Sequence, residues 1–361
     1  MNDQAAATGL GLVRADDRSE AVAALVQHVG RRVGLQGVLA DLNRTGRVGP
    51  VPASAAVWGF RLQAEDDHSP RWWPQGITTS GDANADGQVG GRSVVLTSAY
   101  SKEVNGLHMG SRITVTDVTE PNRVRYRHVL LVEALEVDGQ LELRPVKVHA
   151  GGLVWHGRHL HVAATARGLA TFRLDDILEV PRSGAAARFG LGADGALDAF
   201  GHRYVLPLRF RYVAEHAAAV APMRYSFLSL ERDDGAVRLV AGEYGRDGAT
   251  TRLLRYAIDP ASRLPAEDWL GRSRPLEVEV GVDGMQGAVV VGGRHYLSTS
   301  AGPSRHGSIW VGTPDALERR PGVLPVGPED LSYAAATDRI WCVSEYPRHR
   351  YVFAMDRSRL D

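Results

Sequence analysis

The sequence predicts an all-β fold in which five copies of one strand–turn–strand–loop–strand unit close into a five-bladed β-propeller. Each copy opens with a small or polar stretch that leads into an apolar strand. The five stretches are Gln75-Gly76-Ile77, Gly151-Gly152-Leu153, Tyr225-Ser226-Phe227, Gln286-Gly287-Ala288 and Glu329-Asp330-Leu331. Repetition of a multi-strand β unit is typical of radial or stacked folds, and five copies favour a closed ring.

The remaining strands of each unit follow from alternating apolar segments between turns. A hairpin turn is expected at 83–92, 156–158, 232–235, 292–294 and 337–339. The second strands are expected over 93–99, 159–164, 237–242, 295–299 and 340–344. The third strands are expected over 112–118, 169–174, 251–258, 308–312 and 351–355. Outer strands are expected over 126–135, 204–213, 275–280 and 323–326.

The fifth unit has no outer strand of its own, because the chain stops soon after Tyr351–Met355. Ala55–Gln63 has the pattern of a strand and precedes the first unit. We expect Ala55–Gln63 to pair with Tyr351–Met355 as the outer strand of the last blade. Such pairing removes a sheet edge that would otherwise be exposed to aggregation.

Residues 1–54 are expected to form an N-terminal tail and helical segment outside the propeller, which spans residues 55–361. Residues 1–16 are small, polar and aperiodic, and we expect them to be frayed. Apolar residues of Asp17–Val29 recur at helical spacing, and Leu35–Leu42 can continue the helix.

The composition excludes several classes of partner. The 42 basic and 42 acidic residues balance, which gives no long-range field favouring nucleic acid or an anionic membrane. The single cysteine, Cys342, cannot form an intrachain disulfide and is expected to be buried. The sequence has neither a membrane-spanning stretch nor a signal peptide. We expect a cytoplasmic protein; a secreted protein whose export signal has been removed is the alternative. The oligomeric state stays open.

One end of the predicted propeller concentrates acids, bases and aromatic side chains. The starts of the inner strands and the loops after the second strands meet at this end, and such loops carry function on rigid scaffolds. The strand starts contribute Trp73, Gln75, His149, Tyr225, Gln286, Glu329 and Asp330. The loops contribute residues that include Tyr100, Lys102, Arg167, Arg305, Glu345 and Tyr346.

Two adjacent carboxylates, Glu329 and Asp330, are the predicted catalytic acid and base, with His149 as their partner. Burial and a neighbouring like charge raise a carboxyl pKa toward neutrality, where it can donate a proton. The predicted substrate-binding residues are Trp73, Gln75, Arg167, Tyr225, Gln286, Arg305, Glu345 and Tyr346. The alternative is structural, with the two glutamines satisfying backbone groups and the two acids forming a solvated turn.

Asp82, Asn84 and Asp86, followed by Gly87, match the first half of a calcium loop. The glutamate that would complete an EF-hand is missing, since Ser93 stands in its place. A plain turn is the alternative. Calcium bound here would be structural, and the sequence indicates no other cofactor.

The runs Trp73–Thr79, Val148–Gly152 and Met285–Ala288 resemble a group of largely uncharacterised actinobacterial β-propeller proteins. The resemblance spans about residues 55 to 361; it implies the fold and brings no assigned activity. Five-bladed glycoside hydrolases use a carboxylate at the start of the first blade. Gln75 stands at that point here, which counts against glycosidase chemistry.

Two main interpretations of function remain. The first is an enzyme that performs cofactor-independent acid–base chemistry on a small organic substrate, by cyclisation, elimination or hydrolysis, for example in secondary metabolism. The second is a propeller that binds a ligand or partner without chemistry, and a glycan-active hydrolase or lyase is a further alternative. A carboxylate with a shifted pKa beside His149 would favour the enzyme.

Overall fold

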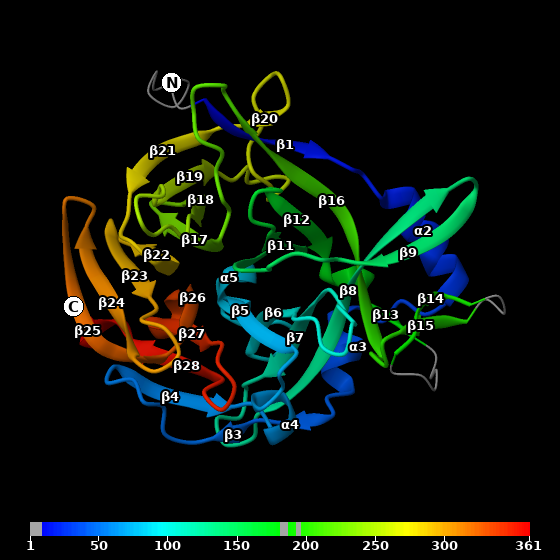
Figure 1. Ribbon diagram of the computed structural model, residues 1–361, viewed down its shortest axis with the longest axis horizontal. Helices are drawn as coiled ribbons and strands as arrows, with labels where there is room; N and C mark the ends of the chain where they lie inside the picture. Colours follow the sequence, from blue (N-terminus) through cyan, green and yellow to red (C-terminus); the bar gives the residue numbers. More distant parts are fainter. Residues whose placement is uncertain (1–8, 181–186, 193–195) are drawn as a thin grey trace.

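The computed structural model describes residues 9–180, 187–192 and 196–361, which form β-strands arranged around a central axis (Figure 1). Five inner strands lie closest to the axis. They are β5 (Trp72–Thr79), β10 (Leu153–His156), β17 (Phe227–Asp233), β22 (Met285–Val291) and β26 (Pro328–Ala334). Each inner strand contacts the next in this order, and β26 contacts β5, so these strands surround the axis. This arrangement is a β-propeller.

Each inner strand starts a four-stranded antiparallel meander. The second strands are β6 (Val94–Ser101), β11 (His159–Ala163), β18 (Ala236–Gly242), β23 (Arg294–Thr299) and β27 (Arg339–Ser344). The third strands are β7 (Ser111–Asp117), β12 (Leu169–Arg173), β19 (Arg252–Ala257), β24 (His306–Thr313) and β28 (Tyr351–Asp356). The outer strands are β8 (Arg125–Val137), β16 (Tyr204–His216), β21 (Pro275–Val280), β25 (Ala316–Val326) and β4 (Ala56–Arg61).

The strand near the N-terminus joins the last meander, as the sequence predicts. β4 pairs antiparallel with β28, from Tyr351 opposite Arg61 to Met355 opposite Ala56. The short strand β3 (Arg47–Val48) adds to the outside of β4. Chain segments from the two ends of the sequence therefore share one sheet, at the lower edge of Figure 1.

The two meanders that start at β5 and β10 are joined edge to edge, which the sequence did not indicate. β16 pairs in parallel with β8, with Val205 opposite Leu130, so both meanders belong to one large sheet. The strand β1 (Leu10–Ala15) then pairs antiparallel with β16. The prediction that residues 1–16 are frayed is therefore wrong for this segment, because buried Leu10 and Leu12 anchor it in the core.

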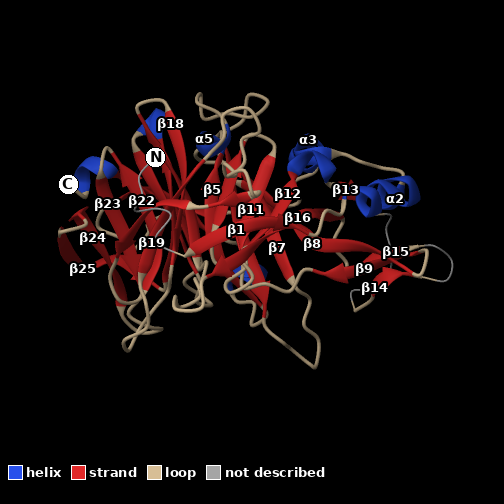
Figure 2. Ribbon diagram, turned by 90° about the horizontal axis from the view of Figure 1, so that it is seen from above, coloured by secondary structure: helices blue, strands red, loops and turns tan. Residues whose placement is uncertain are grey.

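The predicted N-terminal helical segment is present as α2 (Ser19–Val29) and α3 (Gly34–Ala40), which lie toward one side of the propeller (Figure 2). Cys342 is fully buried in β27, as predicted. No helix within the described ranges is both long and apolar enough to cross a membrane. The other elements are β2 (Arg44–Thr45), β9 (Gln140–Pro145), β13 (Leu178–Glu179), β14 (Phe189–Leu191), β15 (Leu197–Ala199), β20 (Arg272–Ser273), α4 (Ala64–Asp67), α5 (Ser80–Ala83) and the 3-10 turns Leu174–Asp176, Ala335–Thr337 and Arg357–Arg359.

Glycines at the starts of the inner strands allow neighbouring backbones to meet at the axis. A Cβ atom on Gly152 would lie 2.2 Å from the Leu228 backbone nitrogen, and one on Gly287 would lie 2.6 Å from that of Leu331. A Cβ on Gly76 would lie 2.8 Å from the Gly152 carbonyl carbon. The small residues that mark the repeats in the sequence are thus required where one backbone approaches another.

Replacing Gly152 with alanine tests this close approach. We expect Gly152→Ala to lower the free energy of unfolding by about 3 kcal/mol, because the new methyl group overlaps the backbone of β17. Gly49→Ala is the matched control, since among the described residues nothing beyond its two chain neighbours lies within 4 Å of a Cβ there, and it should change stability by less than about 0.5 kcal/mol. Denaturant unfolding measures both, and equal stabilities would contradict the packing described.

Candidate functional site

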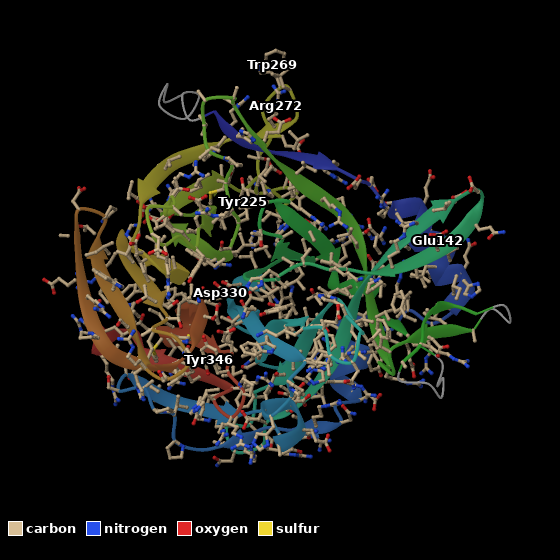
Figure 3. The ribbon with its side chains drawn as sticks, viewed as in Figure 1. Glu142, Tyr225, Trp269, Arg272, Asp330 and Tyr346 are labelled. Carbon is tan, nitrogen blue, oxygen red and sulfur yellow. The ribbon has the colours of Figure 1, made fainter. Side chains whose placement is uncertain are left out.

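Asp330 lies at the axis and connects three inner strands (Figure 3). Its Oδ2 accepts hydrogen bonds from the backbone N–H groups of Ile77, at 3.1 Å, and Leu153, at 3.2 Å. These donors belong to β5 and β10, whereas Asp330 itself belongs to β26. The side chain is fully buried. Asp330 therefore joins the backbones of three meanders at their closest point.

The surroundings of Asp330 indicate a structural rather than a chemical role. Burial raises the pKa of its carboxyl well above the ordinary value, and the backbone N–H groups of Ile77, Leu153 and Leu331 act in the opposite direction. Its Oδ1 has no hydrogen-bond partner among the described residues. The carboxyl is enclosed by strand backbones and has no exposed surface, which does not favour the proton-donor role predicted for Asp330.

Glu329 lies beside Asp330 and is held by an amide. Gln286 Nε2 donates a hydrogen bond of 3.3 Å to Glu329 Oε1, and the glutamate is only 3% exposed. Burial raises its pKa well above the ordinary value, and the charges of Glu345 and Asp330 raise it further. The Glu329 carboxyl is therefore easier to protonate than an exposed glutamate.

A second glutamate, Glu345, lies closer to solvent in the loop after β27. Gln75 Nε2 donates to its Oε2 at 3.0 Å, and the buried Arg350 Nε donates to its backbone carbonyl at 2.9 Å. Burial raises the Glu345 pKa, although hydrogen bonds from Tyr346 and Gln75 and the charge of Lys102 oppose the shift. Glu345 is half-buried, so it combines a raised pKa with access to solvent.

β-Bulges position the polar side chains of these strand starts. The pairing register shifts between Pro74 and Ile77 in β5, between Met285 and Gly287 in β22, and between Pro328 and Leu331 in β26. Gln75, Gln286 and the Glu329–Asp330 pair each fall inside one of these shifts. A bulge redirects a side chain that regular alternation would point elsewhere.

Aromatic and basic side chains from neighbouring loops lie next to the two glutamates. Trp73 and Tyr346 meet edge to face with ring centroids 5.6 Å apart, and the Lys102 ammonium lies 3.1 Å from the Trp73 centroid. The Tyr100 and His149 rings are 4.6 Å apart. Burial, with the charges of Glu345 and Glu329, raises the Tyr100 pKa to about 12, which places Tyr100 near both acids.

His149 lies next to Tyr100 on this surface. Its side chain is exposed, yet the surrounding protein excludes enough water to lower its pKa, and the Lys102 charge lowers it further. Its ring contacts Tyr100, and no hydrogen bond joins it to a carboxylate among the described residues. The partnership of His149 with the two acids stays a prediction, since the ring contact is with Tyr100.

The structure brings most of the predicted site residues together and leaves three out. Tyr225 points into the hydrophobic core, where its hydroxyl bonds that of Tyr256 at 2.7 Å, so its predicted contact with substrate is wrong. Arg167 and Arg305 are exposed on the loops after β11 and β23. Neither arginine takes part in the contacts that join the two glutamates to their neighbours. Tyr100 and Lys102 belong to the site, although the sequence assigned them no role.

The predicted calcium loop does not bring its side chains together. Asp82 is buried and accepts hydrogen bonds from Thr78 Oγ1, at 2.7 Å, and Ser332 Oγ, at 2.8 Å. The Asn84 amide donates to the Gln88 carbonyl and the Asp86 carboxylate accepts from the Gln88 N–H, as in an ordinary turn. Across the described part of the chain, no cluster of three or more His, Cys, Asp or Glu side chains could hold a metal ion.

No family model and no curated protein sequence matches this chain. Solved structures that resemble it include the GH43_1 enzyme from Xanthomonas citri complexed with xylose, at 13% identity and a TM-score of 0.36, over 83% of this chain and 89% of that one. The Cps50 (Swd1) β-propeller domain of Myceliophteria thermophila has 8% identity and a TM-score of 0.38, over 86% and 99%. The gluconolactonase XC5397 from Xanthomonas campestris has 13% identity and a TM-score of 0.34, over 87% and 89%. Likenesses this remote assign no activity.

The buried acid Glu329 predicts a pH-dependent stability difference. A carboxyl whose pKa is raised above 4.5 on folding contributes stability below that pH, and the contribution is lost as the pH rises through the folded pKa. Glu329→Gln does not titrate, so its melting temperature relative to the wild type should rise from about pH 4 to about pH 9. If the folded pKa is higher than the unfolded pKa by about one pH unit, Glu329→Gln should gain about 1.4 kcal/mol of unfolding free energy relative to the wild type over this pH range. Glu103→Gln, at an exposed position, is the control, and parallel profiles for Glu329→Gln and the wild type would contradict the assignment.

We expect substitutions of Asp330 to lower the unfolding free energy, because its carboxyl group accepts backbone hydrogen bonds. Asp330→Ala leaves the Ile77 and Leu153 N–H groups buried without an acceptor, which should cost about 3 kcal/mol of unfolding free energy. Asp330→Asn retains one carbonyl oxygen and should lose less. Denaturant unfolding separates these outcomes, and an alanine variant as stable as the wild type would refute the structural role.

Proposed function

We propose that this chain is a five-bladed β-propeller that performs acid–base chemistry on a small polar organic substrate at the end of the axis where the inner strands start. The five meanders, whose inner strands contact one another in turn around the axis, support five blades. The observation that carries the proposed chemistry is the pair Glu329 and Glu345. The pKa of each carboxyl is raised, and only Glu345 of the two is open to solvent.

Glu345 is the proposed general acid. A proton donor works best when its pKa lies near the working pH, and partial burial moves the Glu345 pKa in that direction. Glu329 is more deeply buried, and the charge of Glu345 raises the Glu329 pKa further. Gln75 and Gln286 hold the two carboxyl groups through their amide N–H donors.

Trp73, Tyr346 and Lys102 are the proposed substrate-binding surface. The two aromatic rings offer an apolar wall, and the Lys102 ammonium over Trp73 provides a donor for an oxygen or a negative group of the substrate. The Tyr100 and His149 rings lie next to each other, and burial lowers the pKa of His149. A carboxyl group and an imidazole at one end of the propeller suit hydrolysis, elimination or cyclisation.

Two other functions fit parts of this geometry. Paired carboxylates beside aromatic rings are also found in glycan-active hydrolases and lyases. Binding without chemistry is favoured by one observation, namely that His149 contacts Tyr100 rather than a carboxylate. Both alternatives use the same residues, so one experiment can separate them.

We expect Glu345→Gln to reduce turnover by about 10²–10⁴-fold, because it removes the proton donor and keeps the side-chain shape. The substrate would first be found by incubating the protein with metabolite extracts and with aryl glycosides and following depletion by mass spectrometry. A compound consumed by the wild type and by Glu103→Gln, but not by Glu345→Gln, identifies the reaction. Glu103 is the matched control because it is an exposed acid on the adjacent loop after β6.

The same assay also shows which results would refute the proposed enzyme activity. Compounds that the wild type retains but does not convert would support a binding protein and refute the enzyme. Turnover that is equal in the wild type and Glu345→Gln would refute the catalytic role of this acid. Conversion of aryl glycosides alone would assign the glycan-active alternative.

A further inference from the structure

A pocket rich in arginines lies on the opposite side of β5 from the axial site. Its volume is about 430 Å³, within the range of small-molecule sites. Among the described residues, five arginines line it and no carboxylate does: Arg44, Arg71, Arg112, Arg127 and Arg203. Adjacent residues of a strand point to opposite faces, so Trp72 faces this pocket whereas Trp73 faces the axial site.

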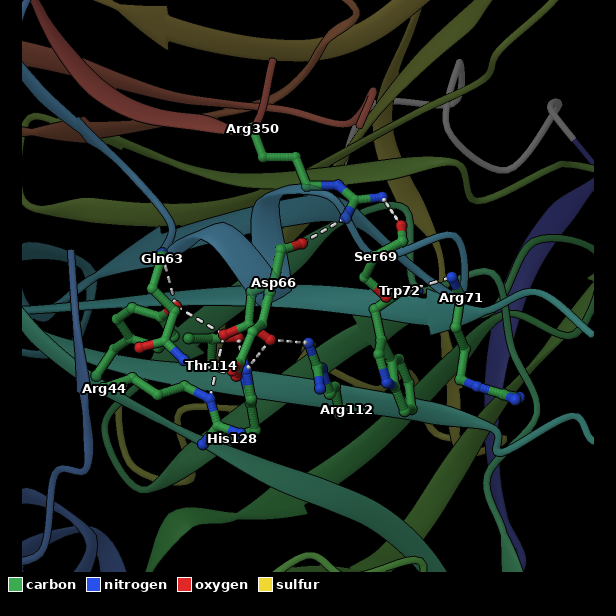
Figure 4. A network of polar contacts seen from close by, with 12 residues as sticks. Arg44, Gln63, Asp66, Ser69, Arg71, Trp72, Arg112, Thr114, His128 and Arg350 are labelled. Carbon is green, nitrogen blue, oxygen red and sulfur yellow. Dashed lines mark hydrogen bonds and ion pairs between the residues drawn. The ribbon is translucent and has the colours of Figure 1, made fainter. Parts of the chain in front are cut away.

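Positive charge exceeds negative charge around the pocket. Arg44 and Arg112 share the single carboxylate of Asp66, at 3.1 and 3.4 Å (Figure 4). Arg71 has no ion pair among the described residues, and its guanidinium donates to the backbone carbonyls of Val104 and Leu107 instead. Two positive charges are therefore left without a counter-charge on this side of the pocket.

The opposite wall repeats this imbalance. Arg203 shares Glu179 with Arg31, so one carboxylate again serves two arginines. Arg127 is the exception, because it has Asp41 to itself at 2.9 Å. Excess positive charge held in a concave site is what favours a bound anion.

The two histidines of the pocket add no charge. Burial lowers the pKa of both His128 and His202 to about 3, and the charge of Arg112 contributes in each case. Both rings are therefore neutral near neutral pH. The positive charge of the pocket comes from arginines alone and does not depend on pH in this range.

The arginines are held in fixed positions before any ligand binds. Arg112 is 6% exposed, its guanidinium lies 4.2 Å from the Trp72 centroid, and its Nε has no acceptor among the described residues. Asp66 is fixed in turn by His128 at 3.0 Å and by Tyr126 at 2.7 Å. Burial raises the Asp66 pKa, but these hydrogen bonds and the Arg112 charge outweigh it and hold the pKa well below its ordinary value.

We propose that this pocket binds an organic oxyanion, a phosphate monoester or a carboxylate, whose apolar part lies against Trp72, Met109 and Phe200. Guanidinium groups form paired hydrogen bonds with such anions, and fixed arginines lose little entropy on binding. The three apolar residues line the same pocket and give room for a small hydrocarbon or aromatic group. This site is distinct from the axial site and does not depend on the chemistry proposed there.

Calorimetric titration of the full chain with phenyl phosphate, inorganic phosphate and benzoate tests the proposal. We expect saturable binding of phenyl phosphate or benzoate, tighter than that of inorganic phosphate because of the apolar group, and weaker in high salt. Stronger binding of phenyl phosphate would indicate a phosphate ester as the natural ligand, and stronger binding of benzoate would indicate a carboxylate.

Variants locate the binding site. Arg71→Gln and Arg112→Lys should each weaken binding at least about tenfold, because each removes charge-assisted hydrogen bonds. Arg144→Gln, at an exposed arginine of β9 outside the pocket, is the matched control and should bind like the wild type. Arg71 is partly exposed, so its variant keeps the test valid if Arg112→Lys does not fold. Three results would overturn the proposal: no saturable binding of any probe, equal affinities for Arg71→Gln and Arg144→Gln, or loss of binding in Glu345→Gln alone.

Discussion

The fold depends on one buried carboxylate at the axis. Asp330 accepts hydrogen bonds from the backbones of β5 and β10 and so links them to β26. Burying a carboxyl group is costly unless hydrogen bonds compensate for lost water. These donors are free to point at the axis because glycines let the inner strands approach closely, and Gly287 lies against Asp330 itself. The close approach of the inner strands at Asp330 thus explains both the small residues at the starts of the repeats and the presence of Asp330 in one of them.

Three acids at this end of the propeller differ in their access to solvent. Asp330 is fully enclosed, Glu329 is almost buried, and Glu345 is half-buried. The charge of Glu345 raises the pKa of Glu329, so the two glutamates are linked electrostatically. Asp330 fixes the start of β26, which also carries Glu329. The structural role of Asp330 is therefore separate from the chemistry that we propose for the glutamates.

Buried Arg350 connects the two sites of the protein. Its guanidinium donates to the backbone carbonyls of Glu345, Asp66 and Ser69. Glu345 belongs to the axial site, and Asp66 pairs with two arginines of the anion pocket. One side chain therefore fixes the backbone on which both sites are built.

The sequence predicted the features that depend on the local pattern of apolar residues and on the number of strands in each repeat. Alternating apolar residues located the second and third strands, and the missing outer strand of the last unit identified the pairing of β4 with β28. The parallel pairing of β8 with β16 was missed, because it joins separate repeats and leaves no periodic signal.

The direction of side chains was the other feature that the sequence could not predict. Tyr225 stands at the start of an inner strand like Gln75, yet it turns into the core, where Tyr256 satisfies its hydroxyl. Asp82 resembles a calcium ligand in sequence, but it bonds Ser332 of another meander. The residues that line the arginine pocket come from separate segments of the chain and form no sequence motif, so the sequence did not indicate this pocket.

The most direct test of the central claim is a titration of the glutamate carboxyl carbons by carbon-13 NMR, from about pH 4 to about pH 9. We expect two glutamate signals with midpoints above the ordinary value, one lost in Glu329→Gln and the other in Glu345→Gln. Glu345→Gln should also move the Glu329 midpoint downward, because the negative charge next to Glu329 is removed. Glutamate signals that all titrate at ordinary pKa values would contradict the proposed pair of acids.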